Sequence, residues 1–499
     1  MAKSDNRIKY NLLSGIVYQV VLIALSFLLP RLYLENFGSE VNGVLSTIKQ
    51  IFTYMCLLEA GIGLAATQAL YKPVAENDRA RSRSILSATG LHYRRTGIIY
   101  AAIVLLIAVA YAFVIPSGIR PAVVFSIVVL TGLPSLFTYF VQAKYRILLE
   151  VDGRKYIINN SETALQLLSN VGKILVLLLT DSLVLIQIVY CSLAILQLGY
   201  VYLRAKRLYP WVAQKAEPDF AAISQRKSVL VHQISGMVFN NTDVLLLSFL
   251  CDFKVVSVYT IYNIFFSQVQ AFITNITSGF AFALGQLFHT DRDKFMKVYN
   301  VYETFYIMAT FIIYTLMAVF LLPLIQIYTK GIQDANYTNV YLVLLFVLMN
   351  LLSCGKLPSN HVLEFSGKFD ETRSHAIWEM VINLVVSVAA ILKWGICGAI
   401  VGTIAALLFR GTMMIFYANK KVLLRSMWCT YKLWLVNGAV FALIMAVFFV
   451  DSFSGLSFGK LLVKGIVHTL WIVPLYLIVN FLFSRDAYKN LLTLRRNKV

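Results

Sequence analysis

A lysine on a polar helix face is the first residue of this sequence that could do chemistry. The apolar run 37–71 is long enough to cross a bilayer as one helix, yet it contains Lys49 and Glu59. An ionisable side chain at membrane depth is costly, so its presence indicates a functional site. The helix face with Lys49 carries three further polar residues: Ser46, Gln50 and Thr53. We predict that this face lines a water-filled cavity in which Lys49 meets an anion.

Lys173 is the second candidate for this anion site. It closes a polar stripe in the run 156–180, in steps of three and four residues: Asn159, Glu162, Gln166, Asn170 and Lys173. At a rise of about 1.5 Å per residue, Lys49 and Lys173 fall at similar depth in the outer half of the membrane. Two cations at one height favour the binding of phosphate or carboxylate. Arg31, at the outer end of the first apolar run, is the third predicted member of the site.

Polar stripes recur in the second half of the chain. They comprise Tyr259, Asn263, Ser267, Gln270, Thr274 and Thr277 in one run, and His375, Glu379, Asn383 and Ser387 in another. From these patterns we predict eight cavity-lining side chains: Gln50, Thr53, Gln166, Asn170, Asn263, Ser267, Gln270 and Thr274. The alternative is that polar stripes join helices through hydrogen bonds, and that Glu59 or Glu162 forms a buried pair with a lysine.

Two acids in the second half are candidates for ion coupling. Asp243 follows Asn240, Asn241 and Thr242, and Glu379 lies within an apolar run. An acid at membrane depth beside Asn and Thr oxygens could hold Na⁺ or exchange a proton. The alternative is a hydrogen-bonded structural acid. His232 and His375 are weaker candidates for carrying a proton.

The composition excludes a soluble protein. The 499 residues are 59% hydrophobic and only 14% charged, and their mean hydropathy is +0.73. Apolar runs of about 20 residues, each the length of one span, recur along the chain. Backbone groups in lipid must bond within their own segment, so these runs are helices. We therefore predict an all-α polytopic membrane protein with about 14 transmembrane helices, although twelve remain if a late pair is misread.

The predicted spans are 8–33, 41–71, 94–115, 121–148, 156–180, 182–203, 227–250, 255–288, 298–328, 337–365, 372–393, 395–417, 431–451 and 460–484. Most of the 44 Lys and Arg residues fall in the tails and even-numbered connections, which places both termini in the cytoplasm. Because the basic residues are scattered and form no basic domain, the net charge of +20 does not indicate nucleic-acid binding. The six cysteines are far apart and predict free thiols without a metal site.

The spans divide into two pseudo-symmetric six-helix lobes plus two C-terminal helices. We expect an N-lobe over 1–208, a cytoplasmic linker over 209–226, a C-lobe over 227–420 and a C-terminal pair with a basic tail over 421–499. Two halves of equal orientation fit a parallel repeat about an axis normal to the membrane.

Motifs for chemistry on bound nucleotides or metals are missing from the sequence. It has no GxxxxGK[ST] loop, no HExxH and no nucleophile-type Ser or Cys motif. We expect no enzyme and no cofactor. Energy for transport must then come from Na⁺ or H⁺ coupling, the membrane potential or a substrate gradient.

The stretches NLLSGIVYQVVLIALSFLLPRLYLENFGSEVNGVLS and LLEAGIGLAATQALYKP carry a resemblance to a known family. Together with the layout of six, six and two spans, they resemble the polysaccharide-exporter branch of the multidrug/oligosaccharidyl-lipid/polysaccharide exporter (MOP) superfamily. The residue-level likeness covers about 11–73.

The resemblance implies two lobes around a central cavity with alternating access. It also implies a flippase in the bacterial cytoplasmic (inner) membrane that moves undecaprenyl-diphosphate-linked oligosaccharide units to the outer leaflet for capsule, exopolysaccharide or O-antigen. Membrane lipids, a polysaccharide polymerase and glycosyltransferases are the partners it implies. Residues 17–29 lack the cavity arginines of the related lipid II flippases, which argues against lipid II as substrate. The alternatives are an ion-coupled exporter of small molecules, for which Asp243 is the coupling acid, and a membrane scaffold without transport activity.

Overall fold

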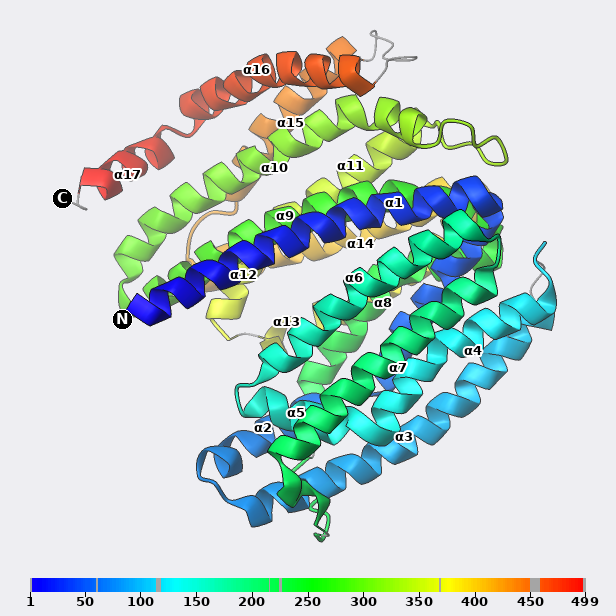
Figure 1. Ribbon diagram of the computed structural model, residues 1–499. Helices are drawn as coiled ribbons and strands as arrows, with labels where there is room; N and C mark the ends of the chain where they lie inside the picture. The colour runs from blue at the N-terminus through cyan, green and yellow to red at the C-terminus, as the bar shows by residue number, and fades with distance from the viewer. Residues whose placement is uncertain are drawn as a thin grey trace. The chain divides into compact units, whose positions relative to one another are not determined.

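A computed structural model describes residues 2–59, 62–113, 118–214, 216–223, 227–367, 369–448 and 458–496. Within these ranges every regular element is a helix, and the chain forms two compact units, 1–241 and 242–499 (Figure 1). Ten helices of the described residues are long and apolar enough to cross a membrane. The protein is therefore an all-α, multi-pass membrane protein, as predicted.

Unit 1 is a bundle of antiparallel helices. Its helices are α1 (Ala2–Met55), α2 (Ile62–Ala75), α3 (Arg79–Phe113), α4 (Pro121–Phe137), α5 (Ala143–Val151), α6 (Lys155–Leu179), α7 (Leu183–Leu208) and the first part of α8 (Lys227–Leu250). Short turns join some of them: η1 (Cys56–Leu58), η2 (Thr138–Gln142) and η3 (Pro210–Ala213). Each predicted span of this half coincides with a helix or with helices in series, so the fourth span is α4, η2 and α5.

A glycine separates the first two spans. The helix α1 is two helices that meet at Gly38, where φ is 78° and ψ is −179°. A side chain strains the backbone at such a φ, so this position requires glycine. The break lies at the outer turn predicted before residue 41. The second span continues through η1 into α2, and residues 60 and 61 between them lie outside the described ranges.

The linker between the halves packs on unit 1. Its Tyr209, Val212 and Ile223 belong to the same buried cluster as Tyr100 and Tyr139, whose rings lie 5.1 Å apart edge to face. The predicted linker starts before α8, whereas the two compact units divide within that helix. The lobe boundaries drawn from the sequence stay a prediction.

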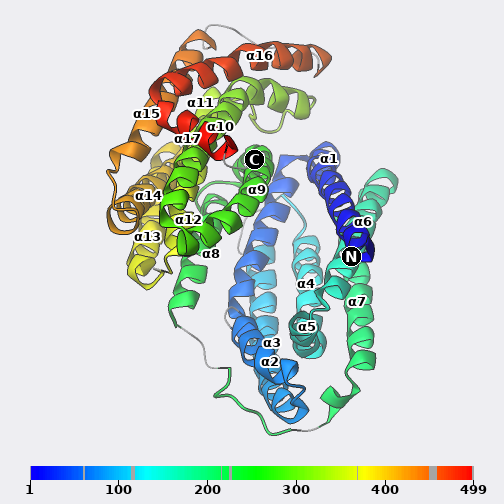
Figure 2. The ribbon, with the colours of Figure 1, turned by 90° about the vertical axis from the view of Figure 1, so that its left-hand side faces the viewer.

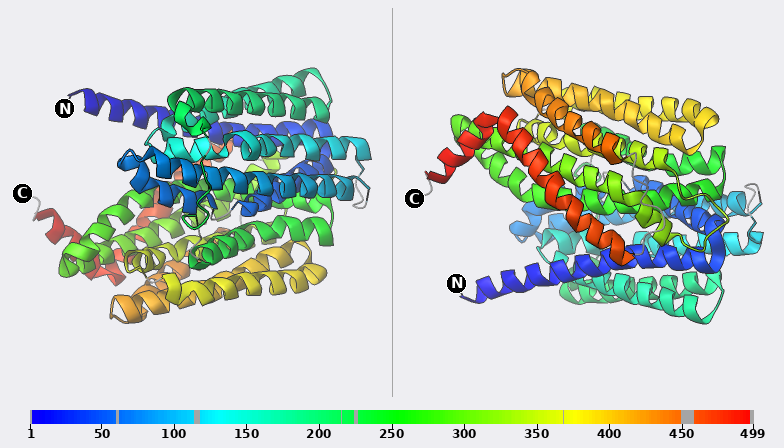
Figure 3. Two further views of the ribbon diagram at one scale, coloured as in Figure 1. Left: turned by 90° about the horizontal axis from the view of Figure 1, so that it is seen from below. Right: turned by 90° about the horizontal axis from the view of Figure 1, so that it is seen from above.

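Unit 2 contains the rest of α8 and nine further helices. They are α9 (Phe253–Thr290), α10 (Arg292–Tyr328), α11 (Val340–Gly355), α12 (Leu357–Phe365), α13 (Phe369–Trp394), α14 (Ile396–Phe416), α15 (Trp428–Phe448), α16 (Phe458–Phe483) and α17 (Arg485–Arg496), with the π-helical turn η4 (Tyr417–Val422) after α14. The pair α13 and α14 packs side by side (Figure 2), and α10 contacts both α15 and α16 (Figure 3). Residues 485–496 were predicted only as part of a basic tail. They form the helix α17, which contacts α10, and the Tyr488 ring lies 5.1 Å from that of Phe305.

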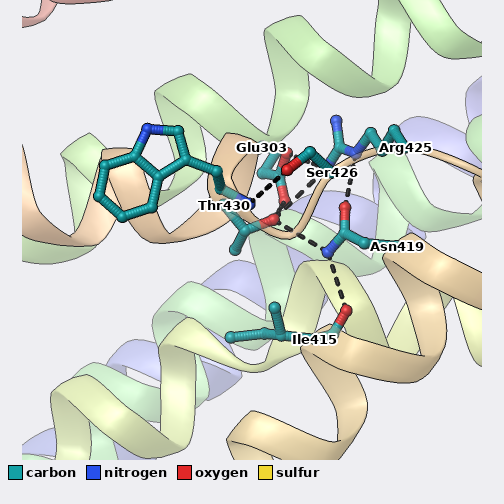
Figure 4. Close-up of polar contacts among 7 residues, drawn as sticks. Glu303, Ile415, Asn419, Arg425, Ser426 and Thr430 are labelled. Atoms are coloured by element: carbon teal, nitrogen blue, oxygen red, sulfur yellow. Dashed lines mark hydrogen bonds and ion pairs between the residues drawn. The ribbon is translucent and has the colours of Figure 1, made fainter.

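A buried ion pair joins α10 to the segment between η4 and α15. Glu303 is 1% exposed and accepts hydrogen bonds from Arg425 and, at 2.7 Å, from the hydroxyl of Thr430 (Figure 4). Arg425 also donates to the Asn419 side chain at 2.6 Å. Glu303 can be fully buried because Arg425 and Thr430 satisfy both of its carboxylate oxygens.

We predict that Glu303→Gln destabilises the protein by about 3–5 kcal/mol, because Arg425 would then stay buried without a counter-charge. The measurement is the thermal unfolding midpoint of the detergent-purified protein. Glu364→Gln is the matched control, since Glu364 is exposed and bonds only to Asn360 among the contacts described. A Glu303→Gln protein as stable as the wild type would contradict this role.

Candidate functional site

The two predicted lysines are neighbours in unit 1. Lys49 lies on α1 with its side chain exposed, and Lys173 lies on α6, which packs against α1. The two ammonium groups are close enough for their charges to repel each other. The Nζ of Lys173 also lies 4.6 Å from the ring centroid of Tyr190 on α7, a cation–π contact that fixes the lysine in place. The structure thus brings the two lysines near each other, and their shared depth in the membrane stays a prediction.

The acids predicted as alternative partners form no ion pair with either lysine among the described residues. Glu162 instead forms an ion pair with Arg146 at 2.6 Å. Among the described residues, neither Lys49 nor Lys173 forms an ion pair with a carboxylate. Two neighbouring ammonium groups without a counter-charge create a local excess of positive charge, which attracts an anion.

An amide beside Lys49 also lacks a partner. The Nε2 of Gln50 is buried and makes no hydrogen bond with any described residue. Buried donors are nearly always satisfied, so an unpaired one indicates a group that binds there, such as water or an anion. Arg31, by contrast, forms an ion pair with Glu35 at 2.6 Å one turn along α1. Its charge is neutralised locally, and its part in an anion site stays a prediction.

The predicted cavity-lining residues differ in what they bind. Three hydroxyls donate to the backbone of their own helix: Thr53 to Lys49 at 3.0 Å, Ser267 to Ile264 at 3.0 Å and Thr274 to Gln270 at 2.8 Å. Gln270 donates at 3.3 Å to Ser353, which joins α9 to α11 as the alternative interpretation expects. Gln166 is exposed, Asn263 is half-buried and Asn170 is buried. A role in lining a cavity stays a prediction for all of them.

Asp243 on α8 is a buried acid held by hydroxyl groups. It is 7% exposed. It accepts a hydrogen bond from the phenol of Tyr259 on α9 at 2.9 Å and from Thr403 on α14 at 3.0 Å. No described lysine or arginine forms an ion pair with it. A buried carboxylate without a cationic partner is costly, so the site suits a bound proton or small cation.

A second amide extends this oxygen-rich site. Asn383 on α13 donates to the hydroxyl of Thr403 at 2.9 Å, and its Oδ1 is buried without a hydrogen-bond partner among the described residues. Carboxylate, hydroxyl and amide oxygens are the donors that hard cations such as Na⁺ prefer. Asp243, Thr403 and Asn383 are therefore the residues that could hold such an ion. The described residues contain no group of three His, Cys, Asp or Glu side chains fit for a transition metal.

Two glycines on α14 bring these side chains together. A Cβ at Gly402 would lie 2.1 Å from the Oγ of Ser387, and one at Gly398 would lie 2.3 Å from the backbone of Ala390. Because glycine is the one residue that fits at both positions, α13 and α14 approach closely, and Asn383 reaches Thr403. Thr403 was not among the site residues predicted from the sequence. The GxxxG spacing of 398 and 402 directly before it was the signal that could have found it.

Glu379, the second predicted coupling acid, has two cationic partners. Lys356 lies 2.8 Å from its Oε1, and Arg410 lies 3.5 Å from its Oε2. All three side chains are largely buried, and Arg410 also donates to the backbone of Thr372 at 3.1 Å. A carboxylate neutralised in this way has less need of a bound ion, so the geometry favours Asp243. The side chain of His232 lies outside those that the structure describes.

Solved structures of other proteins resemble this chain in fold, whereas sequence comparisons find no match. No family model matches the chain, and no curated protein matches its sequence. A solved structure of the lipid II flippase MurJ in an inward closed conformation is similar at a TM-score of 0.65 and 15% identity, over 94% of this chain and 98% of that one.

Two transporters are similar in the same way. An inward-facing multidrug resistance MATE family transporter of the MOP superfamily has a TM-score of 0.59 and 11% identity, over 80% of this chain and 94% of that one. A MOP superfamily transporter from Pyrococcus furiosus has a TM-score of 0.50 and 12% identity, over 81% and 93%. This chain is therefore a multi-pass membrane protein with the fold that these MOP superfamily transporters and the flippase share.

Proposed function

We propose that the protein is a flippase for polyprenyl-diphosphate-linked oligosaccharides. It works by alternating access in the bacterial cytoplasmic membrane, with both termini in the cytoplasm. The observation that carries this proposal is the pair of lysines in unit 1. Lys49 and Lys173 interact electrostatically and have no described carboxylate partner, and Gln50, which follows Lys49 on α1, has a buried amide without a described partner.

A diphosphate fits this pair by charge. Hydrogen bonds between ammonium groups and phosphate oxygens are among the strong ones, and the attraction is stronger at the half-buried Lys173, where water screens the charges less. The anion would also relieve the repulsion between the two lysines. In this proposal the sugars contact polar side chains such as Gln166 and Asn170, while the polyprenyl chain stays in lipid.

The fold supports a lipid-linked substrate. One of the similar structures is a flippase for lipid II, so this fold accommodates a lipid-linked cargo in at least one other protein. The resemblance of residues 11–73 to the polysaccharide-exporter branch suggests surface polysaccharide assembly as the process that the protein serves. A polymerase and glycosyltransferases would then act on the same lipid-linked units.

An ion-coupled exporter of small molecules is the second candidate function. The similar MATE family transporter is a multidrug resistance protein, and the buried Asp243 provides an acid for coupling. Asp243 serves the flippase equally well, since exchange of Na⁺ or H⁺ at this acid could drive either kind of transport. The lysines distinguish the two functions, because a local excess of positive charge repels cationic drugs.

For the anion contact, we predict that Lys49→Ala combined with Lys173→Ala reduces surface polysaccharide export at least about tenfold, because each charged hydrogen bond contributes about 1.5–3 kcal/mol. Export is measured in cells whose chromosomal copy is deleted, beside the amount of protein in the membrane. Lys393→Ala is the matched control, since Lys393 also lies over an aromatic ring, that of Trp394. Normal export by the double variant would overturn the assignment, and lost drug resistance with unchanged polysaccharide would favour the exporter.

For ion coupling, we predict that Asp243→Asn abolishes the dependence of transport on a Na⁺ or H⁺ gradient, because it removes the one charge among the described residues of the site with little change in shape. The measurement is substrate movement in proteoliposomes with an imposed Na⁺ or pH gradient. Thr403→Val keeps the charge and removes one oxygen, so it should weaken the response to the ion without abolishing it. An Asp243→Asn protein that still responds to both gradients like the wild type would contradict this role.

A further inference from the structure

A groove on unit 1 has no part in the proposed transport. It lies between α6 and α7, which run side by side (Figures 1 and 2), and encloses about 480 Å³. Its volume is within the range of pockets that hold small ligands. Four leucines line one end of it, Leu165, Leu168, Leu193 and Leu196, and Leu168 and Leu196 are 58% and 69% exposed.

The groove and the polar stripe occupy opposite faces of α6. Residues 157, 161, 164 and 168 line the groove, whereas the stripe contains residues 159, 162, 166, 170 and 173. At 3.6 residues per turn these two sets point about half a turn apart. A molecule in the groove would therefore not contact Lys173, and the inference below is independent of the proposed function.

The base of the groove needs no polar ligand. Gln197 of α7 donates to the hydroxyl of Ser161 of α6 at 2.7 Å, which joins the helices and satisfies both side chains there. On one side of this bond the groove is lined by Ala164 and the four leucines, and the remaining polar residue of this part of the wall, Asn160, lies one turn from Tyr156 toward the other end. An apolar chain is the occupant that such walls favour.

The other end of the groove is basic and aromatic. Arg204 of α7 is exposed, and the contacts described give its guanidinium no hydrogen bond or ion pair with another residue. The rings of Tyr156 and Tyr200 lie at the same end and are 59% and 52% exposed. Exposed tyrosines beside an arginine are typical of the membrane–water interface, where a basic pocket between helices binds an anionic headgroup.

The length of the groove matches one leaflet. From Tyr156 to Leu168 it follows α6 for about 18 Å, at about 1.5 Å per residue. Half of the hydrocarbon core measures about 15 Å. With Arg204 at the interface, the groove reaches about as far as the middle of the bilayer.

We propose that this groove is a binding site for one anionic phospholipid. An acyl chain lies along the leucines between α6 and α7, and the phosphate contacts Arg204 in the leaflet where α6 begins and α7 ends. A zwitterionic lipid offers the same chain without net charge, so binding should select for the anionic headgroup.

The test is lipid binding to the delipidated, detergent-purified full-length protein, measured by native mass spectrometry during titration with phosphatidylglycerol. Phosphatidylcholine and inorganic phosphate serve as separate ligands. We expect one tight site for phosphatidylglycerol, binding about tenfold weaker for Arg204→Gln, and little competition from inorganic phosphate. Arg207→Gln is the matched control, since Arg207 is exposed at the same helix end but does not line the groove.

Ala164→Trp is a second variant, because Ala164 is exposed in the groove wall and a bulky side chain there fills the space. It should remove the tight site while the lipid-free unfolding midpoint stays near that of the wild type. Equal affinity for phosphatidylcholine, or equal effects of Arg204→Gln and Arg207→Gln, would overturn the proposal. So would displacement of the lipid by inorganic phosphate, which would assign the site to a free anion.

Discussion

The rest of this structure depends on the lack of water in the core of a membrane. A polar or charged side chain there must find its partner within the protein, or from a ligand. Most buried charges of the described chain obey this rule: Glu303 binds Arg425, and Glu379 binds Lys356 and Arg410. These pairs hold helices together and leave no charge for function. The groups that lack such a partner are few, and they are therefore informative.

The groups without a counter-charge differ in sign between the two units. Unit 1 holds Lys49 and Lys173, which form no ion pair with a described carboxylate, whereas the nearby acid Glu162 pairs with Arg146. Unit 2 holds Asp243, which hydroxyl groups solvate but no described cation neutralises. An excess of positive charge suits an anionic substrate, and an unneutralised acid suits a small cation. In the proposed ion-coupled flippase, the substrate and the ion would therefore bind to separate helices, so that substitutions can address the two sites one at a time.

Periodicity in the sequence was sufficient for the helices. The apolar runs predicted them because length and hydropathy largely decide which segments can cross a bilayer, whereas the depth of Lys173 stays a prediction. The ion pairs between helices could not be predicted from the periodicity of the sequence. Whether Glu379 is free depends on Lys356 and Arg410, which lie 23 and 31 positions away and meet it only after the helices pack. Thr403 was missed for a similar reason, since its role requires the close approach that Gly398 and Gly402 permit.

The account rests on an anionic lipid-linked substrate, and transbilayer movement in proteoliposomes tests it most directly. Purified protein is reconstituted with a fluorescent polyprenyl-diphosphate-linked oligosaccharide, with the same glycan on a neutral polyprenyl carrier, or with a cationic dye. The account predicts rapid movement of the diphosphate-linked glycan, and movement of the neutral glycan and the dye no faster than in protein-free vesicles. Transport of the dye without movement of the diphosphate-linked glycan, or equal movement of both glycans, would contradict it.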